Sequence, residues 1–314
     1  MNPSDRDTLP DLLGLVLVDK PEGITSHDIV SRVRRLVGMK RVGHGGTLDP
    51  FATGLVIVAV GRATRLLQYV QDDDKRYLAH VVLGATTDTG DVDGVVVSRS
   101  TATDWPDLDV VKDSLRRFLG EIDQYPPAHS AIKVGGRKLY ELARAGEPVD
   151  VPLRRVTIAS IDVVRYDPPD LILDIRCGKG TYIRSLARDI GDRLGTGGYC
   201  HALRRTESGG FSLDGAWTLE DLSDRNLREE WSFVAVHPDR AVLPSRAALL
   251  TGDQEAEWSH GRSVSWSDRG SALSSVPVLG YSRDGRFLGI GMFDERGDLA
   301  PRLVIPSPLE DGKQ

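Results

Sequence analysis

Cysteine is scarce in this chain, and that scarcity excludes whole classes of protein. Among 314 residues there are two cysteines, Cys177 and Cys200, and they form no C-x-x-C pair. Two cysteines are too few for a disulfide framework, and such low usage is typical of proteins in a reducing compartment. We therefore expect a cytoplasmic protein rather than a small secreted domain held together by disulfides.

Long hydrophobic runs are missing as well. No apolar run approaches the ~18 residues that a membrane helix needs. The N-terminus, MNPSDRDTLPD, is acidic and polar, unlike a signal peptide. The sequence therefore predicts a soluble protein without a membrane partner, and residues 1–11 are expected to form a disordered tail.

Metal and nucleotide motifs are absent from the sequence too. No G-x-x-x-x-G-K-[ST] P-loop occurs, and the seven histidines have no metal-ligand spacing. The stretch DTGDVDG, which starts at Asp88, is similar to a calcium loop, but Thr89 takes the first ligand position and Ser100 the twelfth, where glutamate belongs. DTG is also typical of aspartic proteases, yet a second copy is missing. An enzyme that uses neither metal nor cofactor is the remaining catalytic hypothesis.

What the chain does contain indicates an ordinary globular protein. Hydrophobic residues make up 40% and charged residues 27%, and the length suffices for two domains with a sizeable core. Strand and helix patterns alternate without a regular βαβ rhythm, and several neighbouring strands look antiparallel. We predict an α+β fold with a mixed, largely antiparallel sheet flanked by helices. Helices are expected after a cap at Thr25 or Ser26, at 107–119 and within 180–194, and strands at about 155–165 and 171–177.

The composition shifts near residue 237. From there the pattern is short, with a helix near 246–250 and then apolar segments separated by the turns SRDG and DERGDL, which indicate β-hairpins. We predict a small, mostly β domain over 237–314, appended to a larger domain over 12–236.

Basic residues gather in four clusters although the formal net charge is −6. That charge argues against a chain coated with nucleic acid, but RNA binding follows local patches, in which each neutralised phosphate releases counterions. Solvated helix faces are the plainer explanation for any one cluster, whereas four of them in an acidic protein favour a nucleic-acid partner. The clusters are Arg32, Arg34, Arg35, Lys40 and Arg41; Lys133, Arg137, Lys138 and Arg144, flanked by Tyr125 and Tyr140; Arg176, Lys179, Arg184 and Arg188; and Arg204 with Arg205.

The segment GHGGTLDPFATG, residues 43–54, presents one carboxylate in a glycine-rich loop. Glycine permits backbone conformations that other residues avoid, and Pro50 fixes its own φ angle, so the loop holds Asp49 in one place. A carboxylate held this way can act as a nucleophile, an arginine beside it would lower its pKa, and a tyrosine could stack on a base or move a proton. Tyr77 and Arg184 are the candidates. Spacing alone cannot bring the three together, and each has a structural explanation: a turn acid, a core tyrosine and a surface arginine.

This segment resembles the catalytic motif of the TruB family of tRNA pseudouridine synthases, which reads G-H-x-G-x-L-D-P-x-A-x-G. The resemblance continues in LVDKPEGITSHD, DKRYLAHVVLGATTDTGDVDG, YPPAHSAIKVGGRKLYELARAGE, CGKGTYIRSLARDIG and ALRRTESGGF, and spans about Leu12 to Phe211 in the family's order. The residues after 237 are less distinctive, but they resemble the PUA-like RNA-binding tail of bacterial members. The resemblance implies a pseudouridine-synthase fold in the first domain and a PUA-like fold in the second.

The resemblance also implies an activity, the isomerisation of uridine to pseudouridine at position 55 in the T-loop of tRNA. The base leaves its N1–C1′ bond, turns and rejoins through C5, and no cofactor is needed. Asp49 would be the nucleophile or assist glycal formation, Tyr77 would stack on the base and transfer protons, and Arg184 would pair with Asp49. Substrate-binding residues would be His44, which helps turn the base outward, Leu203, which lines the pocket, and Lys20, Lys133, Arg137, Lys138 and Tyr182.

Two other functions remain open on the sequence. A non-catalytic tRNA-binding or tRNA-folding module could use the same surface, although it would have no need of Asp49, Tyr77 and Arg184 together. A pseudouridine synthase with a different RNA target, such as an H/ACA-guided relative, is the second. The expected partner is the T-arm of tRNA, with no obligate protein partner, and a monomer is the default for a chain with its own RNA-binding tail.

Overall fold

The computed structural model of the protein describes residues 12–71, 74–101, 104–127, 133–134, 136–139, 151–242, 246–266 and 276–305. Residues 1–11, Tyr140 and Arg144 lie outside this part of the chain, and so do the side chains of Lys133 and Lys138. No helix within the described residues is long and apolar enough to cross a membrane.

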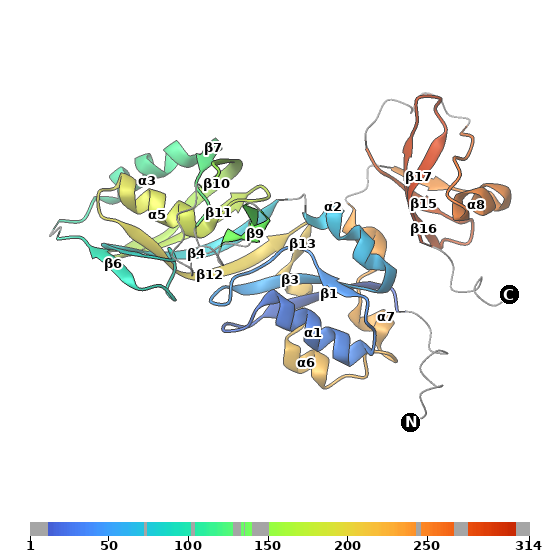
Figure 1. The fold of residues 1–314 in the computed structure, drawn as a ribbon, viewed down its shortest axis with the longest axis horizontal. Helices are drawn as coiled ribbons and strands as arrows, with labels where there is room; N and C mark the ends of the chain where they lie inside the picture. The colour runs from blue at the N-terminus through green and yellow to red at the C-terminus, as the bar shows by residue number, and fades with distance from the viewer. Residues whose placement is uncertain are drawn as a thin grey trace.

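A nine-stranded mixed sheet forms the larger part of the fold (Figure 1). Its strands lie in the order β1-β3-β12-β4-β11-β10-β7, with β2 paired to β3 and β13 to β12. The pairings are antiparallel except for β3 with β12, where Gly54 lies beside Arg205 in parallel register. The predicted α+β class and largely antiparallel sheet are confirmed. The strands are β1 (Gly14–Lys20), β2 (Val42–His44), β3 (Thr53–Val60), β4 (Lys75–Leu83), β7 (Gly120–Gln124), β10 (Arg154–Asp167), β11 (Asp170–Cys177), β12 (Gly198–Ser208) and β13 (Phe211–Ser212).

Helices pack against both ends of this sheet. In Figure 1, α3 and α5 lie over β4, β10 and β11, whereas α1 and α6 lie against β1 and β3. One apolar cluster runs through both groups and includes Val33 of α1 and Ile190 of α5, each fully buried. The helices are α1 (Ser26–Val37), η2 (Gly61–Leu66), α2 (Leu67–Gln71), α3 (Leu108–Leu115), η3 (Arg116–Phe118), α5 (Ile183–Arg193), η4 (Leu213–Gly215), α6 (Leu219–Ser223), α7 (Trp231–Val234) and η5 (Pro238–Ala241). Two short hairpins are β5 (Ala85–Thr87) with β6 (Val96–Arg99), and β8 (Lys133–Val134) with β9 (Arg137–Lys138).

Helix α1 begins where its capping sequence predicts. The Thr25 side chain accepts from the Asp28 N–H, and the Asp28 carboxylate accepts from the Thr25 N–H, which satisfies two donors of the first turn. Gly38 ends the helix in the left-handed conformation, with a φ of 65°. Because Thr25 is the cap, the neighbouring Ser26 is free to serve another purpose, and its side chain is buried.

A second sheet of four strands follows in the C-terminal region, in the order β14-β15-β16-β17. Its elements are β14 (Arg246–Leu249), α8 (Gly252–Ser259), β15 (Val278–Tyr281), β16 (Phe287–Phe293) and β17 (Leu299–Val304). The expectation of a mostly β C-terminal region is confirmed, but the helix expected near 246–250 is wrong. That segment is the strand β14, paired in parallel with β15, because a run this short without a cap forms no stable helix and tertiary pairing decides. The helix comes directly after it, behind the capping residue Thr251.

The second sheet shares an apolar cluster with the first. Phe287 of β16 and Leu303 of β17 belong to the same buried cluster as Ile57 of β3. The Tyr281 hydroxyl also donates to Asp239 Oδ2 at 2.6 Å, which ties η5 to β15 within the predicted second domain. The two sheets are therefore joined by packed side chains, and the position of the boundary stays a prediction.

A close approach of two backbones fixes α5 on the sheet. A Cβ added to Gly191 would lie 2.2 Å from Gly197 C and 2.2 Å from Gly198 N. The N–H groups of Thr196 and Gly197 each donate to the Gly191 carbonyl at 3.0 Å. Because no side chain fits there, glycine sets the distance between the sheet and the helix that carries Arg184.

We expect Gly191→Ala to lower the free energy of unfolding by about 1–3 kcal/mol, because the added methyl group overpacks this contact. The sign of this change distinguishes the contact from ordinary helix propensity, because alanine in place of an unobstructed helical glycine raises the free energy of unfolding by about 0.5–1 kcal/mol. Gly252→Ala is the matched control, because Gly252 begins α8 and nothing lies within 4 Å of its added Cβ. Urea denaturation measures both changes, and a Gly191→Ala protein as stable as the wild type would contradict the prediction.

Candidate active site

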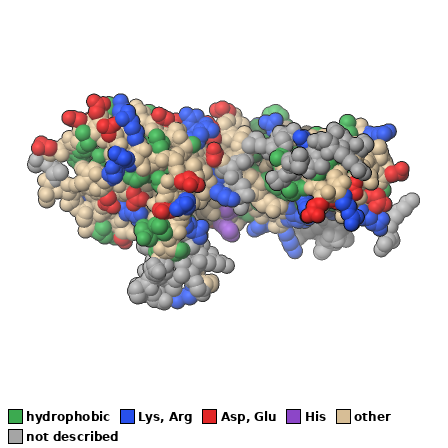
Figure 2. Space-filling model, turned by 90° about the horizontal axis from the view of Figure 1, so that it is seen from above, with side chains coloured by type: hydrophobic (Ala, Val, Ile, Leu, Met, Phe, Trp, Pro, Cys, Tyr) green, Lys and Arg blue, Asp and Glu red, His purple; other side chains and the backbone are tan. Residues whose placement is uncertain are grey.

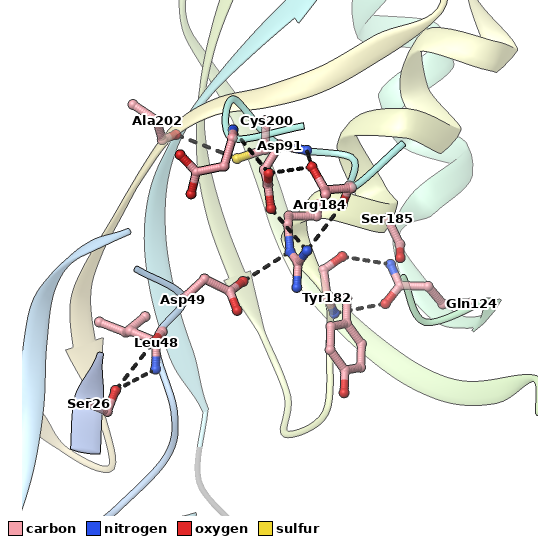
Figure 3. A network of polar contacts seen from close by, with 12 residues as sticks. Ser26, Leu48, Asp49, Asp91, Gln124, Tyr182, Arg184, Ser185, Cys200 and Ala202 are labelled. Atoms are coloured by element: carbon pink, nitrogen blue, oxygen red, sulfur yellow. Dashed lines mark hydrogen bonds and ion pairs between the residues drawn. The ribbon is translucent and has the colours of Figure 1, made fainter. Parts of the chain in front are cut away.

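Arg184 lies buried near the N-terminus of α5, between two carboxylates (Figure 3). It is 4% exposed, its Nε lies 2.9 Å from Asp49 Oδ2, and its Nη1 lies 2.9 Å from Asp91 Oδ2. The same Nη1 donates to the Thr89 carbonyl at 3.1 Å. The guanidinium thus joins the loop between β2 and β3 to the turn between β5 and β6. Arg184 is not the surface helix residue of the plainer explanation.

Burial and neighbouring charges act on Asp49 in opposite directions. Burial raises the pKa of the Asp49 carboxyl above its ordinary value, Arg184 lowers it, and Asp91 raises it again. The expected lowering of the pKa by an arginine is therefore present, but the net direction is upward because desolvation outweighs the ion pair. The Asp49 side chain is still 36% exposed. It is therefore a recessed carboxylate that a substrate can reach, and it is a stronger base than free aspartate.

Two buried side chains hold the backbone on either side of Asp49. Ser26 Oγ accepts from the Leu48 N–H at 2.8 Å, and Lys20 Nζ donates to the Pro50 carbonyl at 3.1 Å. Both side chains belong to residues that are at most 1% exposed. Because these contacts exist without a substrate, the direction of the carboxylate is fixed before anything binds.

Lys20 itself lies fully buried at the end of β1. Its Nζ donates to the Pro21 carbonyl at 2.9 Å as well as to that of Pro50. Burial lowers the pKa of Lys20 to about 8, while the Asp49 carboxylate acts to raise it. These contacts support a role in holding the turn, and the expected contact of Lys20 with the substrate stays a prediction.

Gln124 connects the end of β7 to the start of α5. Gln124 is 1% exposed. Its side-chain amide makes two hydrogen bonds to the Tyr182 backbone: Nε2 donates to the carbonyl at 3.0 Å, and Oε1 accepts from the N–H at 2.8 Å. The Ser185 hydroxyl donates to the Tyr125 carbonyl at 2.7 Å. Figure 3 shows the two bonds between Gln124 and Tyr182 beside Arg184. Gln124 therefore fixes the backbone of Tyr182, two residues before the buried arginine.

Tyr77 and Leu203 lie on the neighbouring strands β4 and β12 and are 8% and 7% exposed. Both belong to the apolar cluster that also contains Ile183, the first residue of α5. Burial raises the pKa of the Tyr77 phenol, so it carries its proton at neutral pH. The roles expected for Tyr77 and Leu203 stay predictions.

His44 ends β2, at the start of the segment that carries Asp49. Its ring meets that of His27 edge-on, with centroids 5.8 Å apart. Burial and the charge of His27 lower the pKa of His44, so its imidazole is neutral at neutral pH. The contact of His44 with RNA stays a prediction.

Most arginines of the third and fourth basic clusters are bound within the protein. Arg184 and Arg205 are buried, and Figure 2 shows Lys and Arg side chains interspersed with acidic ones over much of the visible face. These contacts fit the plainer, structural explanation for the third and fourth clusters, and phosphate binding by any of the four clusters stays a prediction. Arg137 of the second cluster is exposed on β9. The pairs are Arg176 with Glu207 at 2.9 Å, Arg188 with Asp189 at 2.8 Å and Arg204 with Asp19 at 2.6 Å, and in the first cluster Arg34 donates to the Lys40 and Val42 carbonyls at 3.0 and 3.1 Å.

Sequence reasoning missed Asp91, Gln124 and Ser26. Asp91 lies in the stretch DTGDVDG, which the sequence offers as a possible calcium or protease motif and as part of the family resemblance, with no role for Asp91 itself. The number of acids in that turn was a signal, but nothing local shows that one of them faces Arg184. Gln124 and Ser26 bind backbone groups that are remote from them in the sequence. Contacts of this kind leave no recognisable motif or spacing in the sequence.

Three family models match the chain in succession. The one described as TruB family pseudouridylate synthase (N terminal domain) matches residues 34–183. The tRNA pseudouridylate synthase B C-terminal domain matches residues 184–250, and the pseudouridine synthase II TruB, C-terminal, model matches residues 247–305.

Full-length relatives agree with these matches. The chain is 41% identical over 309 residues to the tRNA pseudouridine synthase B of Gloeothece citriformis (strain PCC 7424), covering 95% of this chain and 99% of that one. It is 42% identical over 313 residues to the protein of the same name from Arthrobacter sp. (strain FB24), covering 96% and 100%. A solved Cbf5-Nop10-Gar1 complex contains a similar chain, with a TM-score of 0.71, 25% identity, and coverage of 94% of this chain and 85% of that one. The pseudouridine-synthase fold is confirmed.

We expect Asp91→Asn to lower the free energy of unfolding by about 1–3 kcal/mol, because Arg184 loses one buried carboxylate. The loss stays below the roughly 3–5 kcal/mol of a broken isolated pair, since Arg184 keeps Asp49 and the repulsion between the two acids is relieved. Asp88→Asn is the control, because Asp88 lies in the same turn but accepts from the Val95 N–H at 2.8 Å instead of meeting Arg184. Urea denaturation compares the two, and equal losses would mean that the Arg184 contact contributes nothing.

Proposed function

The chain belongs to the TruB family of pseudouridylate synthases, and on this basis we propose that it isomerises uridine to pseudouridine at position 55, in the T-loop of tRNA. Its full-length relatives at 41% and 42% identity are named tRNA pseudouridine synthase B. One observation carries the assignment of the site: a recessed, partly open carboxylate, Asp49, lies 2.9 Å from the buried Arg184. The protein is thus an isomerase that acts on tRNA.

Asp49 is the reacting carboxylate in this proposal. It either bonds through an oxygen to C1′ or assists removal of the C2′ proton to form a glycal. In both routes the N1–C1′ bond breaks and its electron pair stays on the uracil. The base then turns and C5 bonds to C1′. At this step the bond from Asp49 to C1′ breaks in the first route, and the C2′ proton is returned in the second. The C5 hydrogen leaves as a proton and N1 takes up a proton, so the product is an isomer of the substrate. No electrons are gained or lost, so side chains alone can carry the isomerisation.

The geometry suits this chemistry in two ways. Arg184 holds one oxygen of Asp49 through its Nε, which leaves the rest of the carboxylate for the sugar. Burial raises the pKa of Asp49, which makes the ionised form a better nucleophile and base than free aspartate. The anchors at Leu48 and Pro50 keep this carboxylate from turning away.

The target base must leave the stack before Asp49 can reach its sugar, at a cost of a few kcal/mol. In a single-stranded loop an extruded base is recognised by aromatic stacking and edge contacts. Tyr77 and neutral His44 are the residues proposed for these contacts, with Leu203 lining the pocket. Tyr182, whose backbone Gln124 holds, is proposed beside the substrate as well.

The alternatives have less support. A non-catalytic module has no use for a carboxylate with a raised pKa beside a buried arginine. A different RNA target is not favoured, because the relatives named tRNA pseudouridine synthase B match at higher identity than the chain of the Cbf5 complex. Action as a monomer, a cytoplasmic location, and contacts of Lys133, Arg137 and Lys138 with RNA are part of the proposal.

Tritium release from tRNA transcribed with [5-³H]uridine tests the function. The wild type should release tritium, and Asp49→Asn, which keeps the shape but removes the charge, should lose more than about 10³-fold in rate. Glu22→Gln is the matched control, since Glu22 is an exposed acid in the adjacent turn. Tight tRNA binding by a wild type that releases no tritium would overturn the enzyme and leave the binding module. A fully active Asp49→Asn would remove Asp49 from the chemistry.

The pH dependence of the reaction follows from the raised pKa of Asp49. The reacting form is the carboxylate, and its ionised fraction falls at a higher pH than for ordinary aspartate, whose pKa is 3.8. The single-turnover rate constant should be level near neutral pH and then fall with acidification, by about tenfold per pH unit below the raised pKa. Tritium release at saturating enzyme from pH 8 down to about pH 3.5 measures it, with tRNA binding checked at each pH. A fall whose midpoint lies at or below the ordinary aspartate value of 3.8 would contradict the raised pKa.

A further inference from the structure

Arg205 is a buried guanidinium that the chemistry above does not use. It lies on β12 and is 1% exposed. Its Nε donates to the Leu55 carbonyl at 2.8 Å, and its Nη2 donates to the Gly46 carbonyl at 3.2 Å. Within the described residues no carboxylate forms an ion pair with it. A charge buried on backbone carbonyls alone is costly, and an apolar side chain of similar size would fill the space more cheaply.

The two carbonyls lie at the two ends of the loop that carries Asp49. Gly46 precedes Asp49 by three residues, and Leu55 is in β3, where the loop ends. The backbone of Arg205 also touches the loop: a Cβ added to Gly54 would lie 2.3 Å from the Arg205 carbonyl oxygen. One residue therefore closes the loop through its side chain and through its main chain.

The same residue lies beside Tyr77. Arg205 and Tyr77 are directly paired across β12 and β4, so their side chains leave the sheet on the same face. Burial raises the pKa of the Tyr77 phenol, and the positive charge of Arg205 acts to lower it.

We propose that Arg205 is a positioning residue for the isomerisation, which holds the Asp49 loop in place beside Tyr77. This inference rests on the proposed function. Without the two contacts of the guanidinium, the loop would carry the Asp49 carboxylate away from C1′, and a small displacement of a reacting group slows the breaking of the N1–C1′ bond and the formation of the C5–C1′ bond.

Arg204 provides a matched comparison on the same strand. It is adjacent to Arg205, but its side chain is 41% exposed and pairs with Asp19 at 2.6 Å. The same substitution at the two positions therefore removes an arginine interaction in each case. Arg204 reaches the Thr53 hydroxyl at the start of β3, at 3.4 Å, whereas Arg205 holds the Gly46 and Leu55 carbonyls and lies beside Tyr77.

The experiment compares Arg205→Lys and Arg205→Gln with Arg204→Lys and Arg204→Gln. Tritium release from [5-³H]uridine tRNA is measured in single turnover at saturating enzyme, tRNA affinity by filter binding, and folding by thermal unfolding. For both Arg205 variants we expect a rate constant lower by about 100-fold, as for a small displacement of reacting groups. Their tRNA Kd and the rate constants of the Arg204 variants should stay within threefold of the wild type.

Each other outcome overturns the inference. A folded Arg205→Lys with a rate constant within threefold of the wild type would show that the loop and Tyr77 keep their positions without the guanidinium. Equal losses at Arg204 and Arg205 would assign the effect to the strand as a whole, and failure of both Arg205 variants to fold would make Arg205 a folding residue. A wild type that releases no tritium is a different result, since it contradicts the proposed function itself.

Coupling to Tyr77 provides a second measurement. If Arg205 acts partly through the phenol, Arg205→Lys combined with Tyr77→Phe loses less than the product of the two single losses. Independent, multiplicative losses would contradict the contact with Tyr77 as the route of action and would leave only the contacts with the loop.

Discussion

Arg184 is a guanidinium with carboxylates on two sides, and the rest of the site is arranged around that ion network. Removing an ion from water costs several kcal/mol, whereas the attraction to one partner at 4 Å is worth about 4 kcal/mol at an effective dielectric constant of 20. A single carboxylate that stays partly open to solvent, such as Asp49, offsets little of the free energy that burial of the Arg184 guanidinium costs. Asp91, which is 5% exposed and accepts from the Asp93 N–H, supplies the second charge. Asp91 thereby allows Asp49 to remain available for reaction.

The same constraint explains why the loop around Asp49 is held by buried polar groups. A carboxylate that only paired with Arg184 could follow its movements or rotate toward solvent. The anchors at Ser26 and Lys20 hold backbone atoms instead, so they fix the loop without competing for the carboxylate oxygens. This division lets the site pre-form around the position of the sugar, and pre-formed electrostatics cost no reorganisation during the reaction.

Local chemistry was readable from the sequence, and contacts between distant residues were not. A cap at Thr25 or Ser26 predicted the start of α1, and the resemblance implied that Asp49 and Arg184 pair across 135 positions. The role of Asp91 and the upward direction of the Asp49 pKa depend on burial, which no spacing reveals. The helix expected near 246–250 failed for a related reason, because pairing with β15 overrides the preference of four residues.

The arginines show why a count of basic residues overstates an RNA-binding surface. An arginine that already pairs with a carboxylate, as Arg176 does with Glu207 and Arg204 with Asp19, must lose that partner before it binds a phosphate. Its net contribution to the free energy of RNA binding is therefore smaller. Phosphate binding is driven by the release of counterions when a positive side chain neutralises a phosphate, and a side chain already neutralised by a carboxylate gains less from this. In a chain of net charge −6, attraction to tRNA depends on local patches rather than on the total charge. Selection of one uridine depends in addition on how well the T-loop fits a recessed site, in which the depth of Asp49 excludes any base that remains stacked.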